Sequence, residues 1–469
     1  KINVVNGEYI PVFTSVLGSL EFDEAIDMEI TNEYILITGV TESPDFPTLT
    51  PIMAKHSGGK DIFISSLSLD GSQLLKSSYY GGNGDDVVVE IYRDRNNYFL
   101  FTCHTTSNDI QTIAGPPNSN YKGGIDILMF TVLPSREAIN MSAYIGGFLD
   151  DVPTDIFIDP TNEDIYMTGW TTSSKGTATN DFPIYPLKRF GFGGPYDETS
   201  NGGKDAFEIV LTKNAQSFII SGFLGGDGDD IGRGIYKDVG ENIYIMGETY
   251  NNSKGVPFPV SGSSSTVQGN SDIFITKFND LEEKFGTKLQ TRDYSLLISS
   301  QGNEIMSDMK KHPAINSFSA IISSDGRFPE INLSDLKAKN NIIYTEVEIS
   351  TGGVNNAKVF GGNDDDIAVS FDFDKYNSYL IAGYSISTDF PVSINANQNK
   401  KSSGKDIVLL RNSIGNLTFL NPQTNRSLCV GSEVQISWAG EIIEAKDGYN
   451  IGYSFDEKQD IFTSIASNV

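Results

Sequence analysis

Histidine, cysteine and tryptophan are scarce in this chain of 469 residues, with 3, 2 and 2 copies. The histidines, His56, His104 and His312, have no Cys or Glu at ligand spacing, so a histidine metal site or a histidine-based catalytic group is not expected. The two cysteines say little about the redox compartment. We expect Cys103 to be a buried thiol, and Cys429 to be free or paired with a cysteine outside this sequence.

Basic residues are also few, and none of them gathers into a cluster larger than a pair. The chain has 34 Lys and Arg against 61 Asp and Glu, a formal net charge of −27. A protein that binds phosphates needs a basic patch, so nucleic acid and acidic membrane surfaces are not expected as partners. No apolar run approaches the roughly 18 residues of a spanning helix, which argues against membrane insertion.

Common catalytic motifs are missing as well. The sequence has no Gly-x-Ser-x-Gly elbow, no His-Glu-x-x-His and no phosphate-binding Gly loop before a helix. Carboxylates are so abundant that choosing two of them as a glycosidase pair would be arbitrary. The sequence therefore predicts a protein that is not an enzyme, although chemistry by Asp or Glu stays an open alternative.

A helical apolar period is absent too, and a repeat takes its place. Each unit has a Gly-Gly-acidic turn, an alternating strand, a second strand that ends near Gly-x-Thr, a Phe-Pro pair and a third strand that opens at Gly-Gly-x-Asp. The clearest turns read Tyr80-Gly-Gly-Asn-Gly-Asp-Asp86, Ile145-Gly-Gly-Phe-Leu-Asp-Asp151, Leu224-Gly-Gly-Asp-Gly-Asp-Asp230 and Phe360-Gly-Gly-Asn-Asp-Asp-Asp366. Weaker copies begin near residues 18 and 301.

Four short strands per unit are typical of a propeller blade. A fourth strand runs back to the next Gly-Gly, as in Gln73–Tyr80 and Asn355–Phe360. Six units then predict an all-β, six-bladed β-propeller of four-stranded blades over residues 1–415. The sixth unit lacks a fourth strand, while Tyr9–Leu17 looks like a fourth strand with no blade before it. We therefore expect the N-terminal strand to complete blade six and close the ring.

These units resemble the SBBP family of bacterial β-propeller repeats. That family reads Tyr-x-Gly-Gly, Asp-Asp, Tyr-Val-Thr-Gly, Asp-Phe-Pro and Gly-Gly-x-Asp-Ala-Phe, and the match covers about residues 14 to 412. The resemblance implies a secreted or cell-surface protein of modular build. It brings no enzymatic activity and no catalytic residues.

Residues 416–469 have a different rhythm. Strand-like alternation occurs in 416–422, 434–438, 449–456 and 461–465, and Trp438 is expected in a core. The segment resembles the opening half of the immunoglobulin-like modules of secreted Bacteroidetes-type proteins. A complete sandwich needs about 100 residues, so we expect a partial immunoglobulin-like β-sandwich, continued beyond Val469 or completed by another chain.

The acidic turns are the candidate metal site. Repetition around the ring places carboxylates at one mouth of the channel, where Ca²⁺ would find hard oxygen ligands. The candidates are Asp85, Asp86, Asp150, Asp151, Asp229, Asp230, Asp365 and Asp366. The favoured alternative is that each carboxylate accepts backbone hydrogen bonds in its own Gly-rich turn, so that no cofactor is needed.

Two further repeated features have structural interpretations. The Asp of Gly-Gly-x-Asp is expected to brace a neighbouring blade from a tight turn. This position holds Asp61, Asp126, Asp205, Asp272 and Asp406. The Phe-Pro pairs are expected to pack between blades.

The longest insertion, Ile184–Glu198 in unit three, is the candidate partner-binding loop. Arg and aromatic residues are enriched at protein contacts, and this loop carries Lys188, Arg189, Phe190, Phe192 and Tyr196. A loop packed on itself is the alternative.

Together these features predict a non-enzymatic, secreted structural or adhesion protein at the bacterial cell surface. The propeller would be a rigid interaction scaffold that binds protein partners, copies of itself included, in a filament, tube or layer. The alternative from another class is a carbohydrate-binding or carbohydrate-cleaving propeller, with a glycan as partner.

Overall fold

The computed structural model describes most of the propeller and four short segments after it. The described residues are 2–5, 8–11, 15–117, 119–133, 138–174, 181–185, 196–250, 257–261, 267–284, 287–299, 302–326, 339–374, 377–392, 404–412, 418–421, 437–439, 451–453 and 463–466. Within these ranges every regular element is a β-strand, and none of them is a helix that could cross a membrane.

Six antiparallel sheets follow one another along the chain, as the repeat predicts. Blade one is β3 (Asp23–Ile30), β4 (Tyr34–Thr41), β5 (Asp61–Ser68) and β6 (Leu74–Tyr80); blade two is β7 (Asp86–Arg93), β8 (Phe99–Thr105), β9 (Asp126–Leu133) and β10 (Ala138–Ile145). Blade three is β11 (Asp151–Ile158), β12 (Ile165–Thr171), β13 (Asp205–Leu211) and β14 (Phe218–Leu224); blade four is β15 (Asp230–Lys237), β16 (Ile243–Tyr250), β17 (Ser271–Lys284) and β18 (Thr287–Ile298). Blade five is β19 (Glu304–Lys311), β20 (Ser317–Ser324), β21 (Asn341–Glu348) and β22 (Val354–Phe360); blade six is β23 (Asp366–Phe373), β24 (Tyr379–Ser385) and β25 (Asp406–Asn412).

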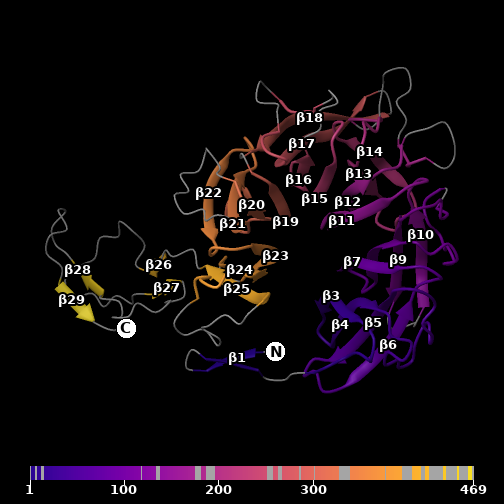
Figure 1. The fold of residues 1–469 in the computed structure, drawn as a ribbon, viewed down its shortest axis with the longest axis horizontal. Helices are drawn as coiled ribbons and strands as arrows, with labels where there is room; N and C mark the ends of the chain where they lie inside the picture. Colours follow the sequence, from indigo (N-terminus) through magenta and orange to yellow (C-terminus); the bar gives the residue numbers. More distant parts are fainter. Residues whose placement is uncertain are drawn as a thin grey trace.

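The first strand of each blade is the innermost one (Figure 1). It begins at or beside the acidic turn, and it carries a β-bulge at its third to fifth residue in all six blades. In blade three the shift lies between Pro153 and Asp155, opposite Gly169 of β12. A bulge bends its strand and raises the local twist, which suits the sharp curvature at the centre of a propeller.

The apolar cores lie between consecutive blades. In the core of blades one and two, Leu36, Ile62 and Ile64 pack with Ile91, and all four are buried. Equivalent clusters join blades two and three, three and four, four and five, and five and six. Blades two to five are therefore sheets whose two faces are covered by their two neighbours.

The Phe-Pro aromatics pack between blades, as expected, and within their own blade as well: Phe182 belongs to the core of blades two and three, and Phe258 to the core of blades three and four. Phe46 stacks on Phe63 of β5 with ring centroids 4.8 Å apart, and Phe258 stacks on Phe274 of β17 at 4.5 Å. Both partners belong to the same blade as the Phe-Pro loop. These aromatics anchor the loop on the third strand of their own sheet, because that strand presents a Phe two residues after its opening Asp.

The predicted N-terminal closure is not what the structure has. β1 (Ile2–Val5) pairs with β2 (Glu8–Pro11), and blade six has three strands in the described residues. Asn6-Gly7 separates the two strands, and Asn-Gly is the dipeptide most favoured in two-residue hairpin loops. This local signal competes with the long-range pairing. Figure 1 shows blades one and six at the two ends of an arc, with the hairpin near the break.

After the propeller the described residues contain four short strands. β26 (Thr418–Asn421) pairs with β27 (Ser437–Ala439), and β28 (Ile451–Tyr453) pairs with β29 (Thr463–Ala466). They fall within or beside the four segments of expected alternation. The sandwich that would unite them stays a prediction, and Cys429 lies outside the described residues.

Candidate functional site

The second Asp of each acidic turn is buried and accepts hydrogen bonds within its turn, although Oδ1 of Asp230 and of Asp366 has no hydrogen-bond partner in the described residues. Oδ2 of Asp86 accepts the Gly82 N–H at 2.7 Å and the Ser107 hydroxyl at 2.8 Å, while Thr105 donates to Oδ1. Asp151 and Asp366 repeat the Gly and Ser contacts, and Asp230 repeats the Gly contact. These carboxylates fix the fold of their own turns, as the favoured alternative predicts.

The first Asp of each turn reaches back to the preceding blade. Asp85 accepts the Lys60 N–H at 2.9 Å, and Asp229 accepts the Lys204 N–H at 3.0 Å. Asp150 and Asp365 accept the N–H groups of Ile125 and Asn340 in the same way. In the part of the chain that the structure describes, no three or more His, Cys, Asp or Glu side chains are grouped to hold a metal. Each of the eight carboxylates proposed from the sequence thus accepts at least one backbone N–H, and a metal site at these residues stays a prediction.

A second set of carboxylates, on the innermost strands of blades one, two, three and five, joins each of these blades to the next. Asp27 of blade one accepts the Ile91 N–H of blade two at 2.8 Å, and Asp155 of blade three accepts the Ile235 N–H of blade four at 2.7 Å. Glu90 bonds to the Ile156 N–H at 3.3 Å, and Asp308 to the Phe371 N–H at 3.2 Å. We call these four groups the latch carboxylates. Each satisfies a backbone donor that the bulge removes from its own ladder.

The latch carboxylates interact electrostatically around the centre of the ring. Burial raises the pKa of Glu90 to about 7, and the charge of Asp27 adds to the rise. Burial also raises the pKa of Asp155 well above its usual range, with repulsion from Glu90 as the second cause. Lys310 opposes both shifts through its positive charge. The centre of this very acidic protein therefore favours protonated or cation-paired carboxylates.

Blade four bonds to the backbone of blade five through different residues. Gly234 stands where blades one, two, three and five carry a latch carboxylate. The Met306 N–H of blade five is accepted instead by Glu248 of β16 at 2.9 Å. Arg233 Nε lies 3.2 Å from Glu248 Oε1 and balances its buried charge. A signal for the regular latches was available in the sequence, because each stands four residues after the first residue of its strand.

Blade one exposes a face that every other blade buries. Met28 has 59% of its surface exposed. The same position is at most 7% exposed in the other five blades, where it holds Ile91, Ile156, Ile235, Met309 and Phe371. Ile26 and Ile30 on the same strand are exposed as well. Among the described residues no blade lies against Met28. We call Ile26, Met28 and Ile30 the seam face of blade one.

Blade six exposes the complementary face. Ile407 and Leu409 of β25 are 85% and 69% exposed, whereas Ile62 and Ile64, their counterparts in blade one, are buried. Leu380 of β24 is exposed, and its counterpart Leu36 is buried. We call Leu380, Ile407 and Leu409 the seam face of blade six. The two seam faces have the chemistry of the core between blades one and two.

The insertion of unit three is described only at its ends. Lys188, Arg189, Phe190 and Phe192 lie outside the described residues. Tyr196 packs on Phe278 of blade four, with ring centroids 5.7 Å apart, and the Arg292 guanidinium lies 5.1 Å from its ring centre. The end of the loop near Tyr196 is therefore anchored to the propeller.

The structure describes the surroundings of Cys103, His312 and His56. Cys103 is a fully buried free thiol, as expected, and burial raises its pKa. Nδ1 of His312 accepts the N–H groups of Ala314 and Ile315 in a turn of blade five. His56 Nε2 lies 4.0 Å from Asp61 Oδ2. In these contacts the partners of the two histidines are backbone N–H groups for His312 and a carboxylate for His56.

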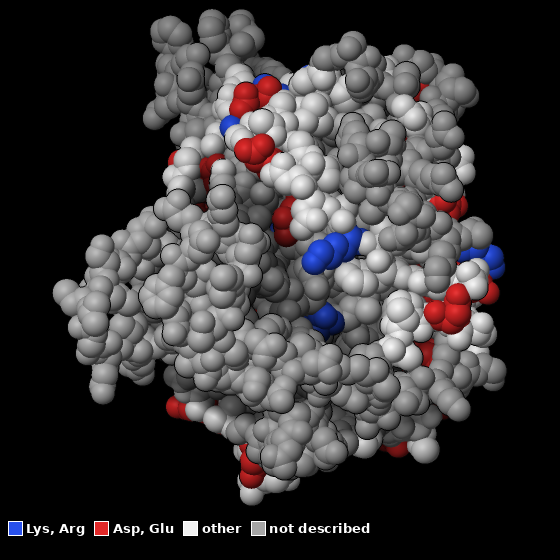
Figure 2. Space-filling model, turned by 90° about the vertical axis from the view of Figure 1, so that its left-hand side faces the viewer, with Lys and Arg blue, Asp and Glu red and all other residues white. Residues whose placement is uncertain are grey.

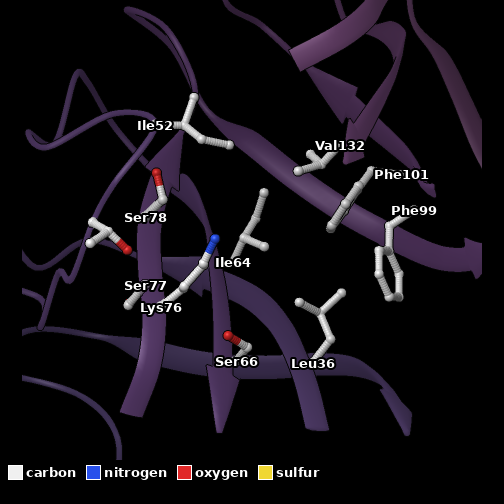
Figure 3. A pocket seen from close by; sticks show the side chains of 11 residues that line it. Leu36, Ile52, Ile64, Ser66, Lys76, Ser77, Ser78, Phe99, Phe101 and Val132 are labelled. Atoms are coloured by element: carbon white, nitrogen blue, oxygen red, sulfur yellow. The ribbon is translucent and has the colours of Figure 1, made fainter. Parts of the chain in front are cut away.

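Two hollows lie between blades. Figure 3 shows the smaller one, where side chains of blade one such as Ile64 and Lys76 and of blade two such as Phe101 and Val132 line the wall together. Its volume of about 40 Å³ leaves no space for a ligand much larger than water. The other, of about 280 Å³, lies between blades two and three and is lined by Tyr92, Asn96, Tyr98, Asn140 and Lys213 among others.

Surface charge is dispersed on the side of the molecule that lies at the left in Figure 1. Figure 2 shows acidic side chains as separate small groups over the described part of this side, with single basic groups beside a hollow. No broad basic patch is visible in the described part of this side.

Comparisons with known proteins show no family for this chain. No family model matches it, and no curated protein sequence matches it. Among solved structures, the NanB sialidase K499G mutant from Streptococcus pneumoniae is similar at 8% identity and a TM-score of 0.39, over 80% of this chain and 68% of that chain. Hydrazine synthase from Kuenenia stuttgartiensis is similar at 9% identity and a TM-score of 0.36, over 74% of each chain. A β-xylosidase, RS223, gives 10% identity and a TM-score of 0.25, over 71% of this chain and 94% of that chain. These likenesses are too distant to indicate a function.

Proposed function

We propose that this protein is a non-enzymatic scaffold of the bacterial cell surface that assembles with copies of itself through its seam faces. The supporting observation is the exposure of Met28 on blade one and of Ile407 and Leu409 on blade six. Apolar surfaces of this kind are unfavourable in water and mark contact sites. The resemblance of the repeat units to the SBBP family supports secretion and a surface location.

A second copy is the partner whose surface fits. The face of blade six in one copy has the same residue pattern as the face of blade one that packs on blade two. The two seam faces are different surfaces of one molecule, so a contact between copies is head-to-tail. Head-to-tail contacts that do not close into a ring generate filaments.

The seam contact predicts an effect of Met28→Glu. A carboxylate at the centre of an apolar contact must be buried without a partner, which costs several kcal/mol. We expect Met28→Glu to weaken self-association at least tenfold in light scattering after size-exclusion chromatography. Val239→Glu is the matched control, because Val239 is fully exposed in a turn of blade four.

Two results would contradict the proposal. A wild-type protein that stays monomeric at all concentrations, without ordered assemblies in electron micrographs, excludes self-assembly. An equal effect of Met28→Glu and Val239→Glu would place the contact away from the seam. Unchanged circular dichroism of both variants shows that the fold is intact.

The hollow between blades two and three favours glycan binding as the second candidate function. Its volume of about 280 Å³ is close to that of small-molecule sites, and Tyr, Asn and Lys side chains line it. If this function holds, a glycan array gives a ligand whose binding is lost in Tyr98→Ala. An array without any ligand, or a ligand that Tyr98→Ala binds equally well, excludes this hollow as a glycan site.

A further inference from the structure

Two carboxylates hold a buried ammonium group where blade three meets blade four. Lys237 is the last residue of β15, and its Nζ forms ion pairs with Asp159 of blade three and, at 2.5 Å, with Glu241 of blade four. The ring centre of Tyr166 lies 5.7 Å from the same nitrogen. A buried charge needs partners of this kind, because an unpaired charge is costly to remove from water.

The repeat places the same two carboxylates between blades two and three. Asp94 follows the last residue of β7, as Asp159 follows the last residue of β11. Glu163 lies in the turn from β11 to β12 with a φ of 64°, as Glu241 lies in the turn from β15 to β16 with a φ of 66°. Asp94 and Glu163 both line the hollow of about 280 Å³ between these two blades.

The lysine is missing from this second junction. Ile158 is the last residue of β11, as Lys237 is the last residue of β15, and Ile158 lines the hollow. The same strand position is basic in blades two and five, where it holds Arg93 and Lys311. Blade three thus has an apolar residue beside two carboxylates whose counterparts hold an ammonium group.

One oxygen of Asp94 is available for a ligand. Its Oδ1 accepts the N–H groups of Asn96, at 2.8 Å, and Tyr98, at 2.7 Å. Asp159 likewise uses its Oδ1 for an N–H of its own turn, and it uses its Oδ2 for Lys237. Oδ2 of Asp94 accepts no hydrogen bond from the described residues. The oxygen that corresponds to the ammonium-binding one is therefore unused.

The charge of Glu163 is balanced only in part. Its side chain is 11% exposed, and its Oε1 accepts the Arg95 N–H at 3.1 Å. Arg95 Nε lies 4.0 Å from this oxygen, but the Arg95 side chain is 60% exposed, so water screens its charge. Burial raises the pKa of Tyr92, which lines the same hollow, and the negative charge of Glu163 adds to the rise.

Smaller and more polar side chains leave this hollow open. Leu100 stands where blade three has Tyr166, and Thr131, opposite Leu100, stands where blade three has Val210. Tyr166 and Val210 belong to the core between blades three and four. Thr131 Oγ1 is shielded from solvent and has no hydrogen-bond partner among the described residues. Since buried hydroxyl groups usually have partners, this one is an independent sign of a polar ligand.

We propose that the hollow between blades two and three binds a primary alkylammonium group, whose nitrogen pairs with Asp94 and Glu163. The methylene chain of the ligand lies along Ile158 and Leu100, and the ring of Tyr98 is an aromatic neighbour for the cation. Such an amine is charged at neutral pH, because its pKa is about 10.4. A free amine and the lysine side chain of a peptide share this chemistry. The site does not depend on self-assembly at the seam faces.

Isothermal titration calorimetry of the full chain with two amines tests the site. The probes are 1,5-diaminopentane, a free amine, and Nα-acetyl-lysine amide, which stands for a peptide lysine. We expect one molecule to bind per chain and to raise the unfolding midpoint, because a ligand that binds only the folded state stabilises it. The tighter of the two probes identifies the source of the ammonium group. The same lysine amide with its Nε acetylated has no charge and is expected to bind about tenfold more weakly or worse.

Exchange of side chains between the two junctions makes the test specific. Ile158→Lys brings a tethered ammonium group to the hollow, as Lys237 does in the next junction, and is expected to bind neither amine. Ser72→Lys adds the same charge to an exposed turn of blade one and should leave binding unchanged.

Asp94→Asn tests the site without a change of size, in case Ile158→Lys does not fold. The amide keeps an acceptor oxygen for the turn but loses the charge, so we expect the affinity for both amines to fall about tenfold or more. Glu33→Gln, which removes a charge from an exposed turn of blade one, is the matched control.

The proposal fails if neither amine binds, if the acetylated control binds equally well, or if a folded Ile158→Lys binds like wild type. Lys213 also lines the hollow. If its own ammonium group occupies the place, only Lys213→Ala binds the amines, and the wild-type site is wrong as proposed. A glycan that binds in this hollow while neither amine does would likewise overturn the proposal.

Discussion

The free energy of unfolding is expected to fall as the pH rises from about 5 to about 8, with Glu208 as the residue that shows the effect most clearly. Glu208 of β13 is 4% exposed, and its two oxygens accept only the amide of Gln290, at 2.9 Å and 2.7 Å. Burial raises its pKa to about 7. Glu90 and Asp155 shift in the same direction.

The direction of the pH effect follows from proton binding. Below about pH 4, Glu208 is protonated in the folded and the unfolded chain, and it adds no pH dependence. Between the two pKa values the folded chain keeps a proton that the unfolded chain has lost. The unfolded chain is then favoured progressively until the pH passes about 7. One pKa unit corresponds to about 1.4 kcal/mol, so Glu208 alone contributes about 3 kcal/mol of loss.

Glu208→Gln should therefore flatten this dependence. The amide keeps the size of the side chain and one acceptor oxygen for Gln290 but has no charge to bury. We expect little change in urea unfolding at pH 5 and a gain of about 3 kcal/mol at pH 8. Glu33→Gln, at an exposed turn, is the matched control and should change stability equally at both pH values. A wild-type protein that is more stable at pH 8 than at pH 5 would contradict the predicted burial of neutral acids.

Gly169→Ala is expected to destabilise blade three by about 3 kcal/mol or more, because its Cβ has no space. The added atom would lie 2.0 Å from the carbonyl oxygen of Val152 and 2.8 Å from the Cα of Pro153. Both are backbone atoms at the bulge of the facing strand, so the two strands would have to separate. Thermal and urea unfolding measure the loss.

Gly353→Ala is the matched control for this effect. Its added Cβ would meet only the Thr351 hydroxyl, at 3.3 Å, and that side chain can rotate away. We expect a change within about 0.5 kcal/mol. Equal stability of Gly169→Ala and Gly353→Ala would show that the strands of blade three are not held as closely as the structure has them.

The blades could be predicted from the sequence because a short residue pattern marks each of their turns. Gly-Gly followed by Asp86, Asp151, Asp230 or Asp366 marks the start of an innermost strand, and each of these strands begins at that Asp. The latch carboxylates were missed because the expected alternation does not reveal a bulge. Only the bulge turns Asp155 toward the Ile235 N–H of the next blade.

Contacts between distant segments were harder to predict. The Phe of the Phe-Pro pair recurs in five of the six units, which fits packing within a blade as well as packing between blades. In the structure Phe258 does both. Closure by the N-terminal strand was inferred from the number of strands in each unit. The Asn6-Gly7 dipeptide favours a hairpin within the first residues, and this local signal was not weighed against closure. The carboxylates of Asp61 and Asp86 both lie beside Gly81. Because they come from turns of different blades, no local sequence pattern predicts that they are close.

A disulfide across the seam tests the central claim most directly. In a Cys429→Ser background, Met28→Cys and Leu409→Cys put one thiol on each seam face, while Cys103 stays buried. If copies join head-to-tail, mild oxidation gives a ladder of covalent oligomers on a non-reducing gel, and either single variant gives none. A disulfide that forms only within one chain, without a ladder at any protein concentration, would show that blades one and six cover each other and would contradict the account.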